Sequence, residues 1–259
     1  MEHPQEAQRL LDKVEPHEWI ARYLEPHLAG VRSLLSVGCG PGVFLRELAE
    51  RYPEIEVVGV DMSSARILRA EERLKGLPNV RVCVGTAQSL PFECNSFDLV
   101  FSRFLVEYLP DKVSAVTEMV RVCGPGGTLL LQDLDGQLLW HYPEDPQIQA
   151  VTEKILKHLA ETGFDPFVGR KLFSLCLGAS LGNVRVQIDP YHLYAGTIDD
   201  KQYSQWAAKL EIAQPQIIAA LGNEEAARDF SRRFLDYLKR PETLTYCALF
   251  TVNGTKAGL

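Results

Sequence analysis

Short apolar runs alternate with helical patterns between residues 31 and 133. The runs are almost continuously hydrophobic, which is typical of strands that are covered on both faces. Such strands in alternation with helices predict a parallel sheet flanked by helices, and therefore an α/β fold. The predicted strands are Ser33 to Val37, Glu56 to Val60, Val80 to Val84, Phe97 to Phe101 and Thr128 to Leu131.

The segments between these runs carry helix signals. Phe44, Leu48 and Tyr52 recur every four residues, which predicts a helix that lies on the sheet. Ser63 and Asp111 precede two further helical patterns, and their short polar side chains can accept hydrogen bonds from the first turn of a helix. We therefore expect both residues to be N-caps.

The rhythm changes after residue 133, where helical patterns dominate. A strand pattern from Val184 reaches Tyr194, and a long helical segment containing a predicted cap at Asn223 then precedes the last strand pattern, Thr243 to Val252. The predicted segments are an N-terminal helical segment (1–30), a core (31–133), two helical segments (134–182 and 197–241) and the last strands (183–196 and 242–259).

Three alternate glycines, Gly38, Gly40 and Gly42, stop the first apolar run just before a helix. Glycine permits φ > 0 and lets a ligand approach the bare main chain, and the helix start presents unpaired N–H groups. Asp61 ends the next strand, where an acid in nucleotide-binding folds accepts hydrogen bonds from both ribose hydroxyls. The pattern predicts a nucleotide-like ligand. NAD is disfavoured, because its GxGxxG fingerprint needs glycine where this chain has Val43.

The stretch from Leu34 to Phe44, followed by the strand ending in Asp61, resembles motif I of the class I S-adenosylmethionine-dependent methyltransferases, whose glycine loop reads hhxhGxGxG. The resemblance is to small-molecule, type 11-like members. It implies S-adenosylmethionine as cofactor and a Rossmann-like, seven-stranded, mostly parallel sheet with an antiparallel last strand and helices on both faces. Because the last two strands of this class form a close hairpin, the helical segments look like an insertion. We expect them to form a helical cap over the carboxyl edge, where open α/β sheets bind ligands.

The resemblance also implies which residues bind the cofactor. Gly38, Gly40 and Gly42 approach its methionine part, Asp61 takes the ribose hydroxyls and Met62 lies against the adenine face. A carboxylate offers two acceptor oxygens to a vicinal diol, and a thioether suits an aromatic ring. The alternative for Asp61 is to cap the helix that follows it.

Residues 85–92 resemble the adenine-edge segment of the family, GDAExLPF, but depart from it at Thr86 and Gln88. A threonine hydroxyl still accepts a hydrogen bond, but it is shorter than a carboxylate and uncharged. We therefore expect the backbone at Ala87 and the amide of Gln88 to carry more of the adenine recognition.

The end of the predicted fourth strand supplies a further contact in the family, from a backbone carbonyl to the amino group of the cofactor. The resemblance assigns that contact to Ser102. Arg103 follows it, and the sequence leaves two roles open for this side chain. Either it pairs with a carboxylate of the cofactor or substrate, or it forms a structural ion pair.

Methyl transfer is an in-line displacement, so the enzyme chiefly aligns the nucleophile and excludes water. A general base is needed only where the nucleophile begins protonated. The catalytic candidates are His141, Tyr142 and His192, with packing as the alternative role for each histidine. Asp133 either orients a donor or serves as a cap.

The net charge of −7, with no run of Lys and Arg, argues against nucleic acid as a partner. No apolar run approaches a membrane span, and the N-terminus lacks the regions of a signal peptide, so we expect a cytoplasmic protein without a membrane partner. Six cysteines and six histidines show no metal-ligand spacing. We expect a methyltransferase whose acceptor is a small molecule with an oxygen, nitrogen or carbon nucleophile. The alternative is a methyltransferase-like fold that holds the cofactor structurally and serves another reaction or binds a partner.

Overall fold

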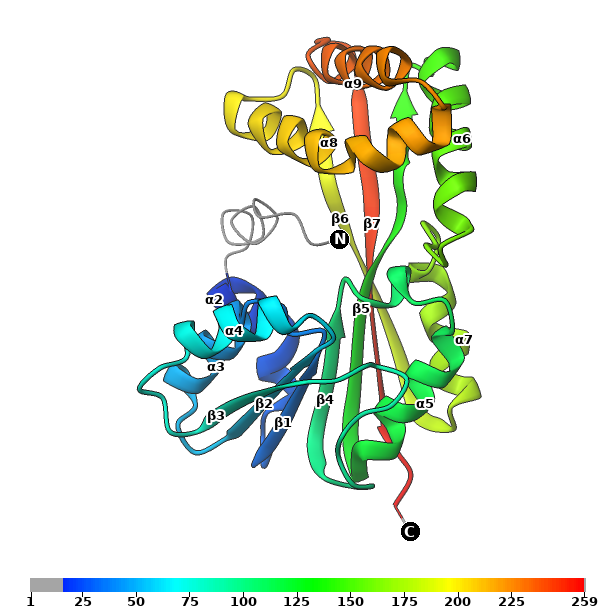
Figure 1. Cartoon of the computed structure of the whole chain (residues 1–259). Coiled ribbons are helices and arrows are strands. Elements are labelled where there is room, and N and C mark those ends of the chain that lie inside the picture. Colours follow the sequence, from blue (N-terminus) through cyan, green and yellow to red (C-terminus); the bar gives the residue numbers. More distant parts are fainter. Residues whose placement is uncertain (1–15, 259) are drawn as a thin grey trace.

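The computed structural model describes residues 16–258, apart from the side chains of residues 137 and 138. Within this range one sheet has the strand order β3-β2-β1-β4-β5-β7-β6 (Figure 1). Strands β1 to β5 are parallel, and β7 runs antiparallel between β5 and β6. This order confirms the predicted Rossmann-like sheet. The strands are β1 Ser33–Val37, β2 Glu56–Asp61, β3 Val80–Val84, β4 Phe97–Arg103, β5 Cys123–Tyr142, β6 Leu181–Ala195 and β7 Leu244–Lys256.

Helices cover both faces of the sheet, and each face has its own buried cluster. Leu34 and Leu99 face the N-terminal helices, whereas Leu35 and Val100 face α5 and α7. On the first face lie α2 (Pro16–Trp19), η1 (Ile20–Leu24), η2 (Glu25–His27), α3 (Val43–Arg51) and α4 (Ser64–Arg73). On the second lie η3 (Val106–Tyr108), α5 (Lys112–Val122), η4 (Gly169–Lys171) and α7 (Leu172–Gly178). Residues 1–15 of the predicted N-terminal segment lie outside the described range.

The predicted caps are confirmed by hydrogen bonds at the helix starts. Ser63, Asp111 and Asn223 each accept a hydrogen bond from a backbone N–H in the next helix, at 3.3, 2.9 and 2.7 Å. Each bond satisfies a donor that would otherwise be unpaired, so these residues fix where α4, α5 and α9 begin.

Residues 134–182 do not all join a helical cap as predicted, because residues 134–142 are strand and the helix near residue 175 lies on the sheet. Residues 134–142 continue β5, since His141 and Tyr142 pair with Thr245 and Leu244 of β7. At the other end, α7 packs on the sheet, where Leu172 and Cys176 are fully buried. Periodicity missed the strand because its pairing partner comes about a hundred residues later in the chain.

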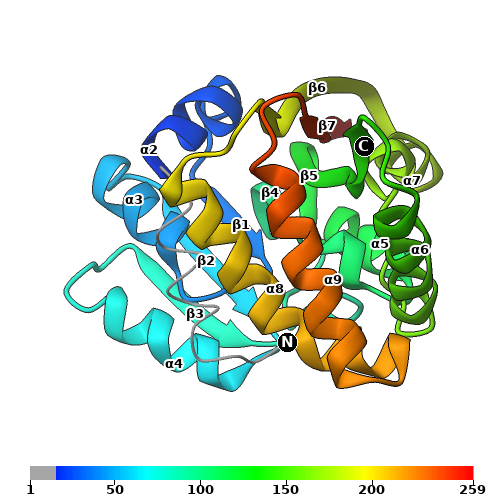
Figure 2. The ribbon, with the colours of Figure 1, turned by 90° about the horizontal axis from the view of Figure 1, so that it is seen from above.

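Three helices stand above the carboxyl ends of the parallel strands, carried there by the long strands β5, β6 and β7 (Figure 1). They are α6 (Pro146–Ala160), α8 (Asp200–Leu221) and α9 (Glu224–Leu238), here called the upper helices. Seen from above, α8 and α9 cross over the sheet (Figure 2). Their shared core includes Trp206 and Phe234, whose ring centroids lie 5.2 Å apart. Arg233 of α9 also pairs with the α6 cap Asp145 at 2.9 Å.

Candidate functional site

The glycine loop between β1 and α3 bends through three residues with positive φ. Gly38, Gly40 and Gly42 have φ of 76°, 56° and 76°, in the region that glycine tolerates best. The Gly38 N–H donates to the carbonyl of Val60 at 2.8 Å, which ties the loop to β2. A Cβ built on Gly40 would meet no atom of the described residues within 4 Å, although Gly40 itself is buried. The side of Gly40 that would carry a side chain is therefore empty, as a surface that receives a ligand requires.

Asp61 lies directly beside this loop. One oxygen of its buried carboxylate accepts from the Gly40 N–H at 2.9 Å, and the other accepts from the Ser63 N–H at 3.0 Å. Arg66 lies 3.9 Å from the same carboxylate. The loop and the end of β2 are thus within hydrogen-bond distance of each other. They are close enough to contact one nucleoside.

Gly59 allows this approach, and the sequence analysis did not single it out. A Cβ on Gly59 would lie 2.4 Å from Leu45 Cδ1 and 2.8 Å from Cys39 Sγ. The missing side chain lets α3 and the glycine loop lie against β2. The sequence signal that could have identified Gly59 is its position in the strand, two residues before Asp61. Burial, followed by the charge of Asp61, also raises the pKa of the Cys39 thiol, which argues against a reactive cysteine in the loop.

The adenine-edge segment lies next to the end of β2. The Gly85 N–H donates to the Asp61 carbonyl at 3.1 Å, and the segment then turns through a bond from the Ser89 N–H to the Thr86 carbonyl. Thr86 is exposed, Ala87 is buried and Gln88 is half-buried. The side chain of Met62, on the other side of Asp61, is 73% exposed.

The hydroxyl group of Ser102 is buried at the end of β4 and lacks a hydrogen-bond partner among the described residues. The Ser102 side chain is 1% exposed. In the sheet Ser102 lies opposite Val37, the residue before the glycine loop. Buried polar groups are nearly always hydrogen-bonded, so an orphaned hydroxyl beside open backbone fits a site that a ligand completes.

Side-chain hydrogen bonds from Trp19, Arg22 and Tyr23 tie the N-terminal helices to β5 and β6 across the carboxyl edge. Trp19 donates to the side-chain oxygen of Gln132 on β5 at 2.6 Å. The Tyr23 hydroxyl donates to Asp189 on β6 at 2.9 Å. Burial and this bond raise the pKa of Tyr23 to about 12. A phenol held protonated in this way serves as a tether and is a poor base at neutral pH.

The catalytic candidates lie on the extended part of the sheet, and their roles stay predictions. His141 has Nδ1 2.9 Å from the Thr245 hydroxyl and packs against Phe234 and Tyr237 of α9, with ring centroids 5.4 Å away in both cases. The side chain of Tyr142 is 71% exposed.

His192 is connected to the glycine-loop side of the sheet through its neighbour Tyr191, whereas the contacts given above for His141 are with α9 and β7. Its ring centroid lies 4.4 Å from that of Tyr191, which contacts the end of β4, and 5.0 Å from that of Trp206 on α8. Its φ of 49° is rare for a residue with a side chain and coincides with a register irregularity in β6. Such strain gathers at functional sites.

Asp133 is fully buried and its two oxygens accept backbone N–H groups of Glu107 and Leu134, at 3.0 and 2.9 Å. It therefore caps η3, which was one of its two predicted roles. Burial raises the pKa of Asp133 to about 7, since desolvation outweighs the hydrogen bonds that lower it.

Asp133 should give the fold a measurable pH dependence. Its folded-state pKa of about 7 exceeds the ordinary value of 3.8, so the native state binds this proton more tightly than the unfolded chain does. The stabilisation is complete below the unfolded pKa and is lost as the pH rises through about 7. We expect the free energy of unfolding of the wild type to fall, relative to Asp133→Asn, between about pH 4 and pH 7. Urea denaturation at several pH values measures this difference.

Asp98→Asn is the control for this measurement. Backbone and hydroxyl hydrogen bonds from Arg32 and Ser33 outweigh burial and lower the pKa of Asp98, so its contribution is present above the ordinary pKa and is lost only in more acidic solution. Parallel pH profiles for the wild type and Asp133→Asn above pH 4 would contradict the assignment.

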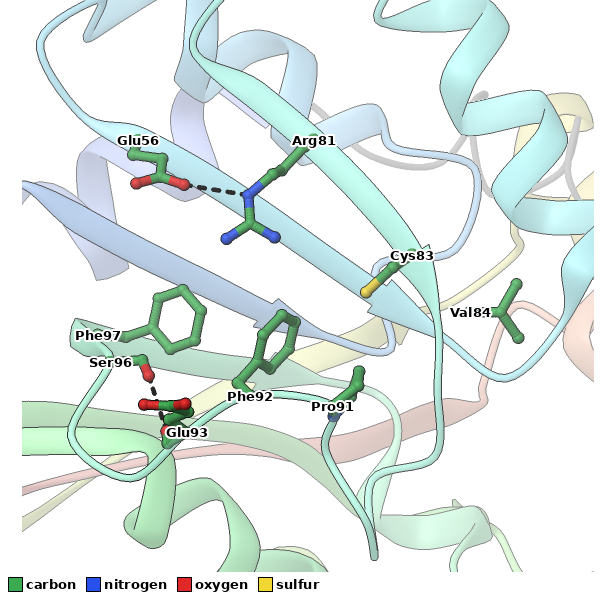
Figure 3. Close-up of a pocket in the computed structure, with 9 residues that line it drawn as sticks. All are labelled: Glu56, Arg81, Cys83, Val84, Pro91, Phe92, Glu93, Ser96 and Phe97. Carbon is green, nitrogen blue, oxygen red and sulfur yellow. Dashed lines mark hydrogen bonds and ion pairs between the residues drawn. The ribbon is translucent and has the colours of Figure 1, made fainter.

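A cavity of about 450 Å³ lies apart from the glycine loop, at the edge strand β3 (Figure 3). It opens where the described connection between β3 and β4 contains no helix to cover the sheet face. The Arg81–Glu56 ion pair, at 3.1 Å, crosses its wall, and Phe92 and Phe97 line its other side. It contains none of the predicted cofactor residues.

The sheet order, the glycine loop and the acid at the end of β2 define a Rossmann-like methyltransferase fold. Residues 35–131 match the family model described as a methyltransferase domain. The match, the sheet order and the glycine loop are those of the class I methyltransferases, which use S-adenosylmethionine as cofactor. Within residues 16–258 no helix combines the length and the hydropathy of a membrane span. The same range holds no group of three side chains suited to a metal ion.

Known proteins resemble the chain over different lengths. It is 26% identical to an uncharacterized methyltransferase of Schizosaccharomyces pombe over 234 residues, which cover 85% of this chain and 82% of the relative. It is 42% identical to the demethylmenaquinone methyltransferase of Geobacillus kaustophilus over 96 residues, which cover 36% of this chain and 41% of the relative. Three other curated relatives are matched over 42%, 62% and 57% of their own length.

Among solved structures, a putative methyltransferase of Bacillus halodurans aligns with a TM-score of 0.61 and 16% identity. The alignment covers 94% of this chain and 99% of that chain. At this identity the likeness shows the fold alone, and it extends over the upper helices as well as the core.

Proposed function

We propose that the protein transfers a methyl group from S-adenosylmethionine to an oxygen, nitrogen or carbon atom of a small molecule held beneath the upper helices. The observation that carries the proposal is a continuous series of aromatic contacts from the core to α8. The ring of Phe104 lies 5.6 Å from Tyr191, Tyr191 lies 4.4 Å from His192, and His192 lies 5.0 Å from Trp206. Small-molecule sites are mostly walled by such apolar and aromatic side chains.

The donor half of the site rests on residues the structure brings together. In the proposal the main chain at Gly38, Gly40 and Gly42 lies along the methionine part of the donor, and Asp61 accepts from the ribose hydroxyls. Met62 and the backbone from Thr86 to Gln88 hold the adenine, and Ser102 contacts the amino group. The orphaned Ser102 hydroxyl and the open backbone at Gly40 support this arrangement.

S-adenosylmethionine supplies an electrophilic methyl group, so the chain has to align the acceptor and exclude water. The upper helices, which we propose act as a cap, would shield the carboxyl edge from solvent. For a protonated acceptor, His192 is the candidate base whose contacts fit best, because Tyr191 links it to Arg103. His141 and Tyr142 would then line the outer part of the cap.

The small size of the acceptor has separate support from charge and from one relative. The chain carries a net charge of −7, which disfavours a polyanionic acceptor. The Geobacillus relative is named for a small organic acceptor, demethylmenaquinone.

Labelled S-adenosylmethionine tests the proposal against two groups of acceptors. One group holds low-molecular-weight phenols, hydroxy acids, amines and quinones, and the other holds transfer RNA, DNA and mixed protein. We expect turnover in the first group only, with inhibition by S-adenosylhomocysteine. Turnover only in the second group would contradict a small acceptor. Tight donor binding without turnover in either group would favour the structural-cofactor alternative.

A further inference from the structure

Arg103 occupies an aromatic cage at the carboxyl end of β4. Its guanidinium carbon lies 3.9 Å from the ring centroid of Phe104, 5.3 Å from that of Phe44 and 5.6 Å from that of Trp19. Phe44 belongs to the first turn of α3, directly after the glycine loop. The cage therefore places a cation at the end of the site where the proposed donor carries its amino-acid group.

The hydrogen-bond partners of this guanidinium are neutral. Its Nε–H donates to the Gln132 side-chain oxygen at 2.9 Å, and the guanidinium also hydrogen-bonds the Tyr191 hydroxyl. Gln132 is itself held in place, because it donates to the Thr251 hydroxyl at 2.7 Å and accepts from Trp19. The network fixes the orientation of Arg103 without neutralising its charge.

Two other partly buried arginines have acidic partners, whereas Arg73 has none among the described residues. Arg121 lies 2.6 Å from Glu118, and Arg233 lies 2.9 Å from Asp145. Across residues 16–258, no carboxylate oxygen lies within 4.0 Å of Arg103. Asp133 favours the charged form of Arg103 from a greater distance, but both carboxylate oxygens of Asp133 accept backbone N–H groups.

A desolvated cation without a counter-ion is costly. Burial lowers the pKa of the Arg103 guanidinium, which is the direction expected when the charged form loses water. The structural ion pair that the sequence left open for Arg103 is therefore not formed within the described chain. Of the two roles that the sequence left open, binding the carboxylate of a ligand is the one that these contacts support.

Resting on the proposed function, we propose that Arg103 is the anchor of a carboxylate subsite between the glycine loop and the upper helices. The planar guanidinium presents N–H groups in a fork that matches the two oxygens of a carboxylate. The surrounding rings and Gln132 hold that fork in place. Two ligands could bring the carboxylate, the amino-acid end of the methyl donor or an acidic acceptor.

Calorimetry with two nucleosides tests the first source. S-adenosylhomocysteine carries the amino-acid carboxylate, whereas 5′-methylthioadenosine has the same adenosine and thioether sulfur without it. If the donor brings the carboxylate, Arg103→Gln should lower the affinity for S-adenosylhomocysteine by about 10- to 100-fold, as expected for the loss of a hydrogen bond to a charged group. The affinity for 5′-methylthioadenosine should not change, and Arg103→Lys should give an intermediate loss.

Benzoate and benzamide test the second source in protein saturated with S-adenosylhomocysteine. If the acceptor brings the carboxylate, the wild type should bind benzoate more tightly than its neutral isostere, and Arg103→Gln should abolish this preference. Unchanged S-adenosylhomocysteine affinity together with no Arg103-dependent benzoate binding would overturn the proposal.

Arg81→Gln is the matched control, because Arg81 is an exposed arginine at the β3 cavity. It should leave every affinity unchanged. Retained 5′-methylthioadenosine binding shows that the Arg103 variants are folded. Wild-type protein that binds neither nucleoside would contradict the proposed function itself, which separates that failure from failure of the carboxylate subsite.

Discussion

Replacement of Asp61 by alanine is expected to weaken S-adenosylhomocysteine binding by at least about 100-fold, because two hydrogen bonds to a charged acceptor would be lost at about 1.5 to 3 kcal/mol each. The same change removes the acceptor of the Gly40 and Ser63 N–H groups. The glycine loop would then lose its bond to the Asp61 side chain and keep only its backbone bonds to Val60 of β2, so we also expect a loss of stability of about 1 to 3 kcal/mol. Calorimetry measures the first effect and urea denaturation the second.

Two variants separate binding from folding at this position. Asp61→Asn keeps one acceptor oxygen and the side-chain volume, so it should lose most of the affinity and less of the stability. Asp98→Asn is the matched control, because Asp98 also accepts two backbone N–H groups, at 2.8 and 3.0 Å, from Arg32 and Ser33 at the beginning of β1. It should lose stability without losing affinity. Wild-type affinity in Asp61→Ala would contradict the ribose assignment.

Replacement of Gly59 by valine should cost about 3 kcal/mol of stability, at the upper end for an overpacked core. The first added carbon would already lie 2.4 Å from Leu45 and 2.8 Å from Cys39, and Leu45 is fully buried. Relief requires α3 and the glycine loop to move off β2. We therefore expect S-adenosylhomocysteine affinity to fall together with the urea midpoint.

Gly182→Ala is the control for a glycine in a strand without a crowded neighbour. A Cβ on Gly182 would meet a single atom within 4 Å, at 3.8 Å. Its stability should stay within about 0.5 kcal/mol of the wild type, as is usual for uncrowded surface positions. A Gly59→Val protein with wild-type stability and affinity would show that the close contact between loop and strand is unnecessary.

The core sheet could be predicted because its signals are local. The strands from Ser33 and Val80 begin and end at the predicted residues, and the caps at Ser63 and Asp111 form as expected. Continuous hydrophobicity follows from burial on both faces, and a cap follows from the unpaired donors of one helix turn. Neither signal depends on distant parts of the chain.

The extended part of the sheet could not be predicted in the same way. Residues 134–142 are a strand because they pair with β7, which comes about a hundred residues later. The sequence therefore predicted His141 and Tyr142 in a helical segment, whereas both residues belong to a strand of the sheet. Strand pairing of this kind is decided by tertiary contacts, so the local pattern carries little information about it.

The sequence by itself determined the type of ligand, because Gly38 to Gly42 and Asp61 are close in the chain and their chemistry is set by residue type. Only the tertiary structure decided which side chains complete the site. It placed Arg103 among Trp19, Phe44 and Phe104 with no acidic partner among residues 16–258, and it gave Asp133 to a helix cap. The reason is physical: the charge that a side chain keeps in the folded protein depends on neighbours from distant segments, and these meet only after folding.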